Sequence, residues 1–494
     1  MPTIGIPSFF SADSFFIDGF SGVLSVLVLL LTLTVSMYSL GYIKERRVSY
    51  FIALILFSLS MVGFLVSDNL FLLFMFWEGL GITSFFLVRH YRTEKSILDS
   101  NLVLLFNKAG DLGLVLAIAT ILLGSGSVFL TEATKSSYED DFQILIQIGL
   151  ATAGLAKSSQ FLFYIWLKKA MSGPTPVSSL LHSATMVAAG SILFLKFQPL
   201  LSTQTVQIIE ITCLLTGIIA AWSASFQNDI KNLLAYSTVS NLSLLCILGS
   251  KGEVDLFLAF FIAHAFFKCG AFLFAGLLSQ TSQSYDFSKL KPQNLFEKFA
   301  AIYLAASLAG LPFFGTSVLK DNLSKIISGS ELLSILTYLS VFYGATFLGK
   351  LLKGPNNQNR KEPFVLTLPI AVLLAFSATT QVWLAANYEG SLSLASTVAK
   401  LGVFALGLLV SLNSKWLDAG HLIESVVLGF AKFLVDAGSV LSKALSSFLE
   451  AASFALYDST KLVGGIYISL TRLSLSSALI LLFVLLFVLF TLIA

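Results

Sequence analysis

The sequence predicts an all-α polytopic membrane protein. Only 12% of the 494 residues are charged, about half the usual share in soluble domains. Hydrophobic residues make up 56% of the chain and the mean hydropathy is +0.87, so a water-soluble protein of this length would lack a polar surface. Continuously apolar runs of about 20 residues, long enough to cross ~30 Å of hydrocarbon, recur through nearly the whole sequence.

Other protein classes are excluded by the same composition. The 45 Phe residues argue against intrinsic disorder, and a count of three Cys argues against a disulfide framework. Cys213, Cys246 and Cys269 lie inside predicted spans, and we interpret them as small core residues. No stretch is basic enough to indicate nucleic acid binding. The apolar runs do not alternate over ~10-residue strands, which excludes a membrane β-barrel.

We predict about 14 transmembrane helices. They cover residues 18–41, 50–66, 69–88, 101–124, 142–167, 176–198, 205–225, 231–249, 253–278, 296–322, 332–352, 364–386, 394–412 and 474–493. Loops after odd-numbered spans hold 17 Lys and Arg, and loops after even-numbered spans hold 5. Because cytoplasmic-side loops are the basic ones, this bias predicts an N-terminus that faces outside.

Two segments differ from the spans. Residues 415–470 place apolar side chains at helical spacing with charged ones between them, which predicts an amphipathic helix lying along the membrane or along protein. Two or three short surface helices are the alternative. The first 18 residues lack a basic n-region and an Arg-rich transit pattern, so we expect no cleavable signal peptide.

A few ionisable residues lie inside the predicted spans, where each one calls for an explanation. Glu78 is the only charge in its span. Burial makes both protonation states of a carboxyl group accessible near neutral pH, as proton loading and release require. The alternative is a structural, hydrogen-bonded carboxyl group.

Lysines follow in the next two spans. Lys108 and Asp111 are three residues apart and share a helix face, so they can neutralise each other or charges elsewhere. A structural ion pair is nearly as plausible as a functional one there. Lys157 follows Gly149 and Gly154 and precedes Ser158 and Ser159, residues that could open the helix, and we interpret it as a proton acceptor.

The second half continues the series with histidines and lysines. His182 comes just after a proline pair that starts a helix, and it could equally be a satisfied core residue. Lys231 lies near a span end, where it could snorkel or pair with Asp229. His264 and Lys268 are one turn apart, so two positive charges there would repel, which favours proton exchange over a static ion pair.

A helix break closes the series. The run AGLPFFGTSVLKDN carries a Gly-Leu-Pro interruption inside a span, with Lys320 and Asp321 just beyond it. Interrupted helices at membrane depth mark transport sites. The chain lacks a Walker motif, a dinucleotide fingerprint, a Cys cluster and HExxH. We therefore expect no metal and no cofactor bound by this chain, and an energy source in a partner or an ion gradient.

Several motifs together resemble the subunit 5 family of NADH dehydrogenase, the distal antiporter-like subunits of respiratory complex I. The resemblance covers roughly residues 8–325, and the remainder matches in layout only. The motifs that carry it are IWLKKAMSGPTPVSSLLHSATMVAAGSILF, FMFWEGLGITSFFLV, AGLAKSSQFLFYIW, FQNDIKNLLAYSTVS, AHAFFKCGAFLFAG and GLPFFGTSVLKD.

The resemblance implies a fold with two inverted five-helix repeats. On this chain it implies an N-terminal helix in 1–49, repeats in 50–198 and 199–352, further spans in 353–414, a lateral helix in 415–473 and an anchor in 474–494. It also implies a proton relay in which Glu78 pairs with Lys157. The other implied members are His182, Lys231, His264, Lys268 and Lys320.

The sequence departs from the family pattern at four places. Two family helices that precede the segment matching FFSADSFFIDGFSG have no counterpart, so they are either dispensable or supplied by another chain. Lys108 stands where the family has Arg, Lys168 where it has Pro, and Phe260 where it has His. The Phe260 change removes one relay member and leaves water or Lys231 to bridge the gap.

The implied function is a proton-translocating subunit of complex I in the mitochondrial inner membrane or a bacterial plasma membrane. NADH, FMN, iron–sulfur clusters and ubiquinone would then belong to partner subunits. The lateral helix would contact the antiporter-like subunits 4 and 2 on the matrix side, and lipids would surround the bundle. A Na⁺/H⁺ antiporter subunit and a membrane scaffold with an unused relay are the alternatives.

Overall fold

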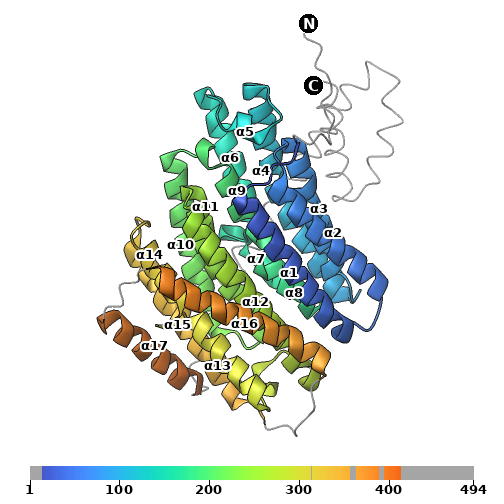
Figure 1. The fold of residues 1–494 in the computed structure, drawn as a ribbon, viewed down its shortest axis with the longest axis vertical. Helices are drawn as coiled ribbons and strands as arrows, with labels where there is room; N and C mark the ends of the chain where they lie inside the picture. The colour runs from blue at the N-terminus through green and yellow to red at the C-terminus, as the bar shows by residue number, and fades with distance from the viewer. Residues whose placement is uncertain (1–13, 313, 356–362, 389–393, 413–494) are drawn as a thin grey trace, which may run out of the picture. The chain divides into compact units, whose positions relative to one another are not determined.

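The computed structural model describes residues 14–312, 314–355, 363–388 and 394–412, all within the compact unit Phe10–His421. Every regular element in these residues is helical (Figure 1). The long helices are α1 (Gly19–Tyr42), α2 (Arg47–Val66), α3 (Leu70–Val88), α4 (Glu94–Ser125), α6 (Asp140–Lys157), α10 (Thr203–Phe226), α11 (Ile230–Lys251), α12 (Val254–Ser282), α13 (Leu295–Ala309), α15 (Ser330–Lys353), α16 (Phe364–Asn387) and α17 (Leu394–Leu412). The short α-helices are α5 (Leu130–Ala133), α7 (Tyr164–Lys169), α8 (Thr175–Ser183), α9 (Met186–Lys196) and α14 (Gly315–Leu323). The 3₁₀ turns are η2 (Phe161–Phe163), η3 (Ala170–Ser172), η4 (Gln198–Leu200) and η5 (Phe287–Lys289).

The predicted class of membrane protein is confirmed. Ten helices of the described chain are long and apolar enough to cross a membrane, counting α8 with α9 as one. Each predicted span up to residue 412 coincides with one helix or with a pair separated by a break. The total of 14 is not confirmed, because the last predicted span and the amphipathic segment 415–470 lie outside the described residues.

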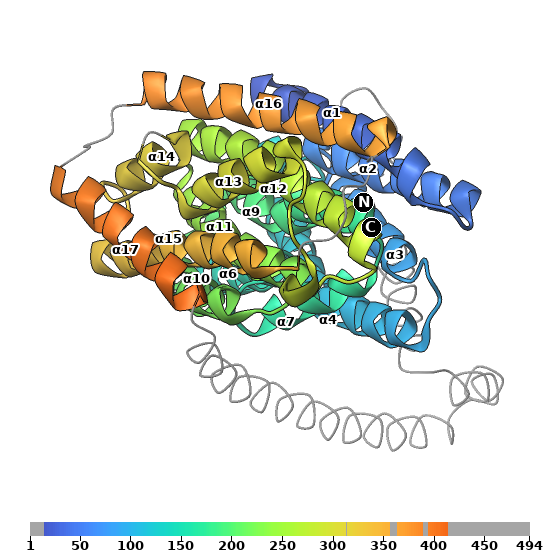
Figure 2. The same cartoon turned by 90° about the horizontal axis from the view of Figure 1, so that it is seen from below.

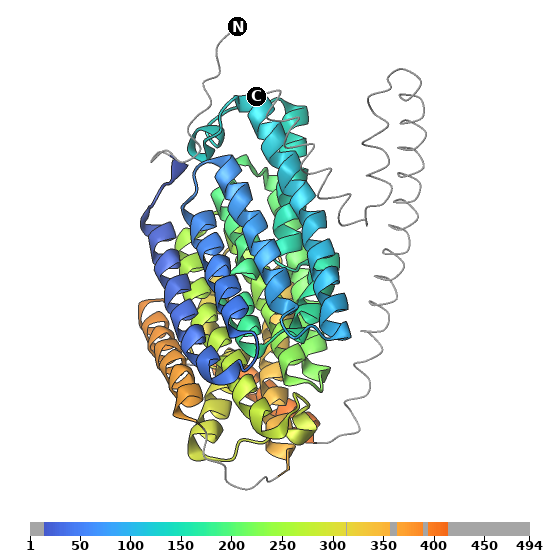
Figure 3. The same ribbon diagram turned by 90° about the vertical axis from the view of Figure 1, so that its right-hand side faces the viewer.

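Burial separates the central helices from those that face lipid. The apolar stretches of α8–α9 and α11 are wholly buried, whereas less than half of each stretch in α1, α2, α4 and α16 is. In Figure 1, α11 and α12 lie between the blue helices α1–α4 and the helices α13, α14, α15 and α17. Figure 2 shows α16 beside α1, and both contact α12. The blue helices α1, α2 and α3 lie side by side in Figure 3.

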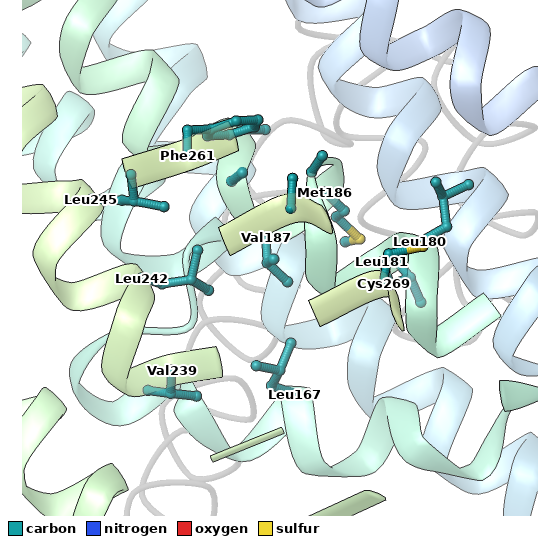
Figure 4. Packing of buried hydrophobic residues seen from close by; sticks show 14 of the residues in the cluster. Leu167, Leu180, Leu181, Met186, Val187, Val239, Leu242, Leu245, Phe261 and Cys269 are labelled. Carbon is teal, nitrogen blue, oxygen red and sulfur yellow. The ribbon is translucent and has the colours of Figure 1, made fainter. Parts of the chain in front are cut away.

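The core joins α7, α8, α9, α11 and α12 through closely packed apolar side chains (Figure 4). The core residues labelled in Figure 4 are Leu167, Leu180, Leu181, Met186, Val187, Val239, Leu242, Leu245, Phe261 and Cys269. The three Cys of the chain are buried and unbridged, as predicted. A tightly packed apolar core of this kind holds the helix breaks beside it in fixed positions.

Three breaks interrupt the apolar stretches. The first separates α6 from η2 at Ser158–Gln160, where Ser159 has φ 58°, so Lys157 is the last residue of its helix. The second, at Ala184–Thr185, separates α8 from α9. The third follows Gly310 (φ 57°), and Pro312 behind it cannot donate a helical hydrogen bond. The first and third breaks occupy the same place, fourth of five, in the two predicted repeats; the inverted relation of those repeats stays a prediction.

Gly149 and Gly154 have a different role from the predicted helix opening. Both lie within regular α6. A Cβ at Gly149 would collide with the Gly113 carbonyl oxygen of α4, and one at Gly154 with the Phe194 ring of α9. These glycines therefore allow close helix packing, and the break arises only at the serines that follow.

The close packing of α6 against α9 predicts a stability effect of a substitution in α9. A Cβ at Gly190 would meet the backbone carbonyl of Gly154, which cannot turn away. We expect Gly190→Ala to destabilise the detergent-solubilised protein by about 1–3 kcal/mol, seen as a lower thermal unfolding midpoint. Gly402→Ala is the control, because nothing lies within 4 Å of its added methyl group. Equal midpoints for the two variants would contradict the close approach of α6 and α9.

Candidate proton relay

Four charged side chains from α3, α4 and α6 form one cluster, the first cluster, in which Lys108 is half-buried and the other three are buried. Glu78 of α3 pairs with Lys108 of α4, and Lys108 Nζ lies 3.2 Å from Asp111 Oδ2. Lys157 Nζ lies 3.2 Å from Asp111 Oδ1, which also accepts a hydrogen bond of 2.6 Å from the Trp77 indole. Two carboxyl groups and two amines thus form a continuous series of ion pairs.

The expected direct pairing of Glu78 with Lys157 is wrong in this structure. Asp111 pairs with Lys157, while Lys108 pairs with Glu78, and α4, which carries Asp111 and Lys108, contacts both α3 and α6. The Lys157 ammonium also lies 4.4 Å from the centre of the Trp77 ring of α3. Lys108 and Asp111, predicted as an ion pair or an interface pair, lie inside the cluster and 3.2 Å apart.

Burial makes the charge state of the first cluster sensitive to a single proton. Lys157 is 1% exposed, Asp111 3% and Glu78 9%. One Glu78 oxygen, Oε1, has no hydrogen-bond partner. Opposite charges in a low-dielectric site stabilise one another strongly, and losing one of them leaves an uncompensated charge. A proton that enters or leaves one member therefore changes the energy of all the others.

His182 and His264 lie next to each other at the centre of the bundle. His264 Nε2 is 3.2 Å from the His182 carbonyl oxygen, and the His182 ring stacks on Phe272 at 4.8 Å between centroids. Both ring nitrogens of His182 and Nδ1 of His264 are buried without a partner. Buried polar atoms in this state are typical sites for bridging water.

Lys231 is held by backbone carbonyls at the start of α11. Its Nζ donates to Met171 O at 2.7 Å and to Gly173 O at 2.9 Å, and the residue is only 2% exposed. Neither sequence-based alternative holds: Lys231 does not snorkel, and Asp229 caps α11 by accepting from the Asn232 amide at 2.9 Å. The 17 Lys and Arg predicted for the loops after odd-numbered spans include Lys231, and that assignment is wrong because Lys231 is buried in α11.

Lys268 contacts α11 rather than a carboxylate. It is fully buried on α12, and its Nζ donates to Ser237 Oγ at 2.5 Å. No acidic side chain in the described part of the chain lies within ion-pair distance of it. His264 lies one turn before Lys268 on α12. These two basic side chains face α8 and α11, one turn apart as the spacing predicts.

A water-sized cavity lies between His264 and Lys320. Its volume is about 10 Å³, close to the minimum that holds one water. Lys320 of α14 is 5% exposed and lines this cavity beside Phe260, the position where the family resemblance implies histidine. The cavity is lined by Asn241, Phe260, His264, Phe267, Ser307, Leu308, Thr316 and Lys320.

Asp321 does not pair with its neighbour Lys320. Lys400 of α17 donates to Asp321 Oδ1 at 3.1 Å and to Ser317 Oγ at 2.8 Å. Lys400 is 3% exposed and was missed in the sequence reading. The sequence does indicate Lys400 as a site residue, because a lone lysine inside the apolar stretch 394–412 is as unusual as Glu78 is in its own span.

Two further buried charges were also missed. Glu210 of α10 pairs with Lys251 at 2.5 Å and accepts from the Gly329 amide at 3.2 Å, which ties α10 to the start of α15. Lys350, counted as a loop residue, is 5% exposed and donates to the carbonyls of Ser225 and Gln227 at 2.8 and 2.7 Å. Both contacts hold helix ends, and neither reaches the first cluster.

A hydroxyl cluster adjoins Lys231. Tyr285, in the segment after α12, hydrogen-bonds Tyr42 Oη at 2.8 Å and Thr175 Oγ1 at 2.5 Å. The Lys231 ammonium lies 5.0 Å from the centre of the Tyr285 ring. Burial opposes ionisation of Tyr285, but Lys231 and the hydroxyl partners outweigh it and lower the pKa of Tyr285 below 10.0.

This shift predicts an early tyrosine titration. We expect absorbance at 295 nm to show a step below pH 10 that Tyr285→Phe removes and Tyr91→Phe leaves, because burial raises the pKa of Tyr91. The folded protein releases the Tyr285 proton at lower pH than the unfolded chain. Its stability relative to Tyr285→Phe therefore grows as pH rises through the lowered pKa toward 10, and is lost below it. A step retained in Tyr285→Phe would contradict the assignment.

Comparison with known proteins places the fold. Residues 67–323 match the family model described as NADH:quinone oxidoreductase/Mrp antiporter, TM. The Mrp complex from Dietzia sp. DQ12-45-1b superposes with a TM-score of 0.72 at 24% identity, covering 92% of this chain and 56% of that one. An archaeal membrane-bound sulfane sulfur reductase superposes at 0.66 and 17% identity, covering 81% and 84%. At these identities the structures support the fold alone.

Curated relatives come from two kinds of complex. NADH-ubiquinone oxidoreductase chain 5 of Petromyzon marinus is 33% identical over 329 residues, which is 65% of this chain and 55% of that protein. A putative antiporter subunit mnhA2 of Staphylococcus haemolyticus is 32% identical over 346 residues, or 65% and 43%. The chain spans about half the length of the curated relatives it matches. Since the matched model covers just over half of the chain, this protein belongs to the NADH:quinone oxidoreductase/Mrp antiporter transmembrane family.

Proposed function

We propose that this chain translocates protons as a membrane-arm subunit of a complex I-type NADH:ubiquinone oxidoreductase. The observation that carries the proposal is the unbroken series of ion pairs from Glu78 through Lys108 and Asp111 to Lys157, buried at a helix break. A static structural pair needs two charges. In a series of four charges, a change of protonation at one end alters the electrostatic energy of the charges at the other end.

The second half of the proposed relay has the opposite composition. Lys231, Lys268 and Lys320 contact carbonyls, a hydroxyl group or a cavity, and none of them forms an ion pair with a described carboxylate. Placing a proton on one such lysine disfavours a proton on the next, because charge repulsion is strong in a low-dielectric interior. Successive loading would therefore push a proton toward Lys320.

We propose the order Glu78, Lys108, Asp111, Lys157, His182, His264 and Lys268, and then Lys320. In this order, water connects His264 to Lys320, and the cavity that both residues line supports this step. We propose that protons enter the second half near Lys231 and the hydroxyl group of Tyr285. The pair Asp321–Lys400 then lies on the exit side of Lys320.

Energy for the cycle would come from partner subunits. We propose that NADH oxidation and quinone reduction, with FMN and iron–sulfur clusters, take place outside this chain. Neighbouring antiporter-like subunits are part of the same proposal. So are an N-terminus on the intermembrane-space side and a lateral helix on the matrix side.

The native complex provides the test. It is purified from its membrane, its subunits are identified by mass spectrometry, and it is reconstituted into vesicles loaded with a pH-sensitive dye. We expect dehydrogenase subunits and NADH-driven acidification that an uncoupler abolishes. A complex without dehydrogenase subunits would contradict the proposal.

A second candidate is a subunit of a multisubunit Na⁺/H⁺ antiporter, which the mnhA2 relative favours. In that case an imposed pH gradient alone should drive ²²Na⁺ uptake into the same vesicles. Sodium uptake without NADH, in a complex that lacks dehydrogenase subunits, would replace the first proposal by this one.

The cavity beside Phe260 gives a variant test of the relay. Phe260→Trp should fill the water-sized space and lower coupled proton transport about tenfold or more, the range of a lost proton-transfer contact. Phe260→His should retain or raise transport, because an imidazole would contact the same cavity. Dye-monitored acidification at equal protein levels measures both. Unchanged transport in a correctly assembled Phe260→Trp complex would rule out proton passage through this cavity.

A further inference from the structure

A groove between α2 and α3 combines an arginine rim with apolar walls. Its volume is about 630 Å³, within the range of small-molecule sites. The rim consists of Arg46, Arg89 and Arg92, which we call the arginine rim. The walls include Ile52 and Leu56 of α2 together with Ile82 and Phe86 of α3. None of these residues belongs to the proposed relay.

The dimensions of the groove match one leaflet of a bilayer. Arg46 lies just before the first residue of α2, and Arg89 just after the last residue of α3, so both mark the same end of the bundle. From Arg46 to Leu56 the helix rises about 15 Å, at 1.5 Å per residue. That is half of the ~30 Å hydrocarbon thickness. The rim then lies at headgroup level and the walls at acyl-chain depth.

The walls are open on the side that faces outward. Ile52, Leu56, Ile82 and Phe86 are between 46% and 58% exposed. On a membrane-spanning helix, apolar side chains with this exposure face acyl chains. The floor is closed by Tyr50 and Leu87, each 1% exposed. An acyl chain could therefore lie in the groove with its length along α2.

The rim carries positive charge that the described chain does not neutralise. Arg89 lies 5.5 Å from the centre of the Phe85 ring, and no carboxylate of the described residues comes within ion-pair distance of the three guanidinium groups. The acidic residues of the adjoining segments are Glu45 and Glu94. Lys44, Arg47 and Lys95 outnumber them there.

The backbone at the rim adopts an uncommon conformation. Arg46 has φ 47° and Arg92 has φ 50°, in the left-handed region that non-glycine residues seldom adopt. Arg46 precedes α2 without a side-chain cap hydrogen bond.

We propose that this groove binds one anionic phospholipid, with its phosphate at the arginine rim and one acyl chain between α2 and α3. Basic pockets between helices at a membrane surface recognise anionic headgroups in this way. The acyl chains of a zwitterionic lipid would also fit the apolar walls, but its headgroup would bring a positive charge toward the arginine rim. A helix from another subunit would instead need acidic residues placed at the rim.

The test uses the full-length protein in its native complex, exchanged into nanodiscs of mixed phosphatidylcholine and phosphatidylglycerol. Lipid that remains bound after re-extraction is identified by mass spectrometry. We expect phosphatidylglycerol to be retained over phosphatidylcholine, and Arg89→Gln or Arg92→Gln to lower that preference about fivefold each. Arg47→Gln is the matched control, because its guanidinium donates to the Ile43 carbonyl at 2.8 Å and does not line the groove.

A second arm tests the acyl part and remains informative if the arginine variants fail to assemble. Ala53→Trp should fill the groove and abolish retention, while Ile55→Trp, on the exposed face outside it, should not. A photoreactive residue at position 52 should give a lipid adduct. Retention that is equal in Arg89→Gln, Arg92→Gln and Arg47→Gln, or a polypeptide adduct at position 52, would overturn the proposal. Proton transport does not enter either arm, so the outcome is separate from that of the proposed relay.

Discussion

Replacing Lys157 by alanine is expected to abolish coupled proton transport while the complex still assembles. Lys157 is the last residue of α6, beside the break at Ser158–Gln160, and its Nζ pairs with Asp111 of the first cluster. Without it, the series of ion pairs ends at Asp111, and no described amine replaces the lost one. Transport should fall by about a factor of ten or more, as for other proton-transfer groups.

The measurement compares dye-monitored acidification with quinone reduction in reconstituted complex. Lys157→Arg is the informative partner variant, because it keeps a positive charge beside Asp111 but holds its proton permanently. Assembly should survive in Lys157→Arg while transport is lost. Lys135→Ala is the control, since Lys135 is exposed on the segment between α5 and α6. A normal ratio of protons to electrons in Lys157→Ala would remove Lys157 from the relay.

The helix breaks could be predicted in part from residue types. Gly310 and Pro312 mark their break directly, because glycine accepts a positive φ and proline lacks an amide hydrogen. The break after Lys157 is less visible, since Ser159 adopts φ 58° without glycine. There the surrounding helices decide: Gly149 and Gly154 bring α6 close to α4 and α9, and the chain can turn only once that contact ends.

The pairing within the first cluster could not be predicted from the sequence. Charges in apolar spans identified Glu78, Lys108, Asp111 and Lys157 individually. Which amine meets which carboxylate depends on how α4 packs against both α3 and α6, and a one-dimensional pattern does not contain that arrangement. The same reason accounts for Asp321, whose partner Lys400 is 79 residues away on α17.

Burial of single lysines was also underestimated where they lie near helix ends. Lys231 and Lys350 lie within two residues of the end of a predicted span, so the count of loop charges includes them. In the structure both ammonium groups turn inward and donate to backbone carbonyls left free at helix ends. Such carbonyls are good acceptors because a helix leaves its last four without partners. A lysine near the end of one span can thus be a buried contact to the end of another.

Asp111→Asn should strongly destabilise this protein. Asp111 joins the two amines of the first cluster and accepts the Trp77 indole hydrogen bond at 2.6 Å. Asparagine keeps the shape of the side chain and removes its charge, so the cluster is left with two amines and one carboxyl group. Breaking a buried ion pair from one side typically costs about 3–5 kcal/mol. We expect a lower unfolding midpoint, reduced assembly and no transport.

A second substitution separates charge imbalance from lost structure. Lys108→Met in the Asp111→Asn background restores a neutral cluster of Glu78 and Lys157, so part of the lost stability should return. In a double-mutant cycle the two changes should be strongly coupled, because both residues belong to one network. Additive losses would instead mean that Asp111 acts through its Trp77 contact alone. In the double variant, stability should return but transport should not. The path from Glu78 to Lys157 would still lack both intervening charges. Recovered stability without recovered transport distinguishes a relay from an ion-pair scaffold.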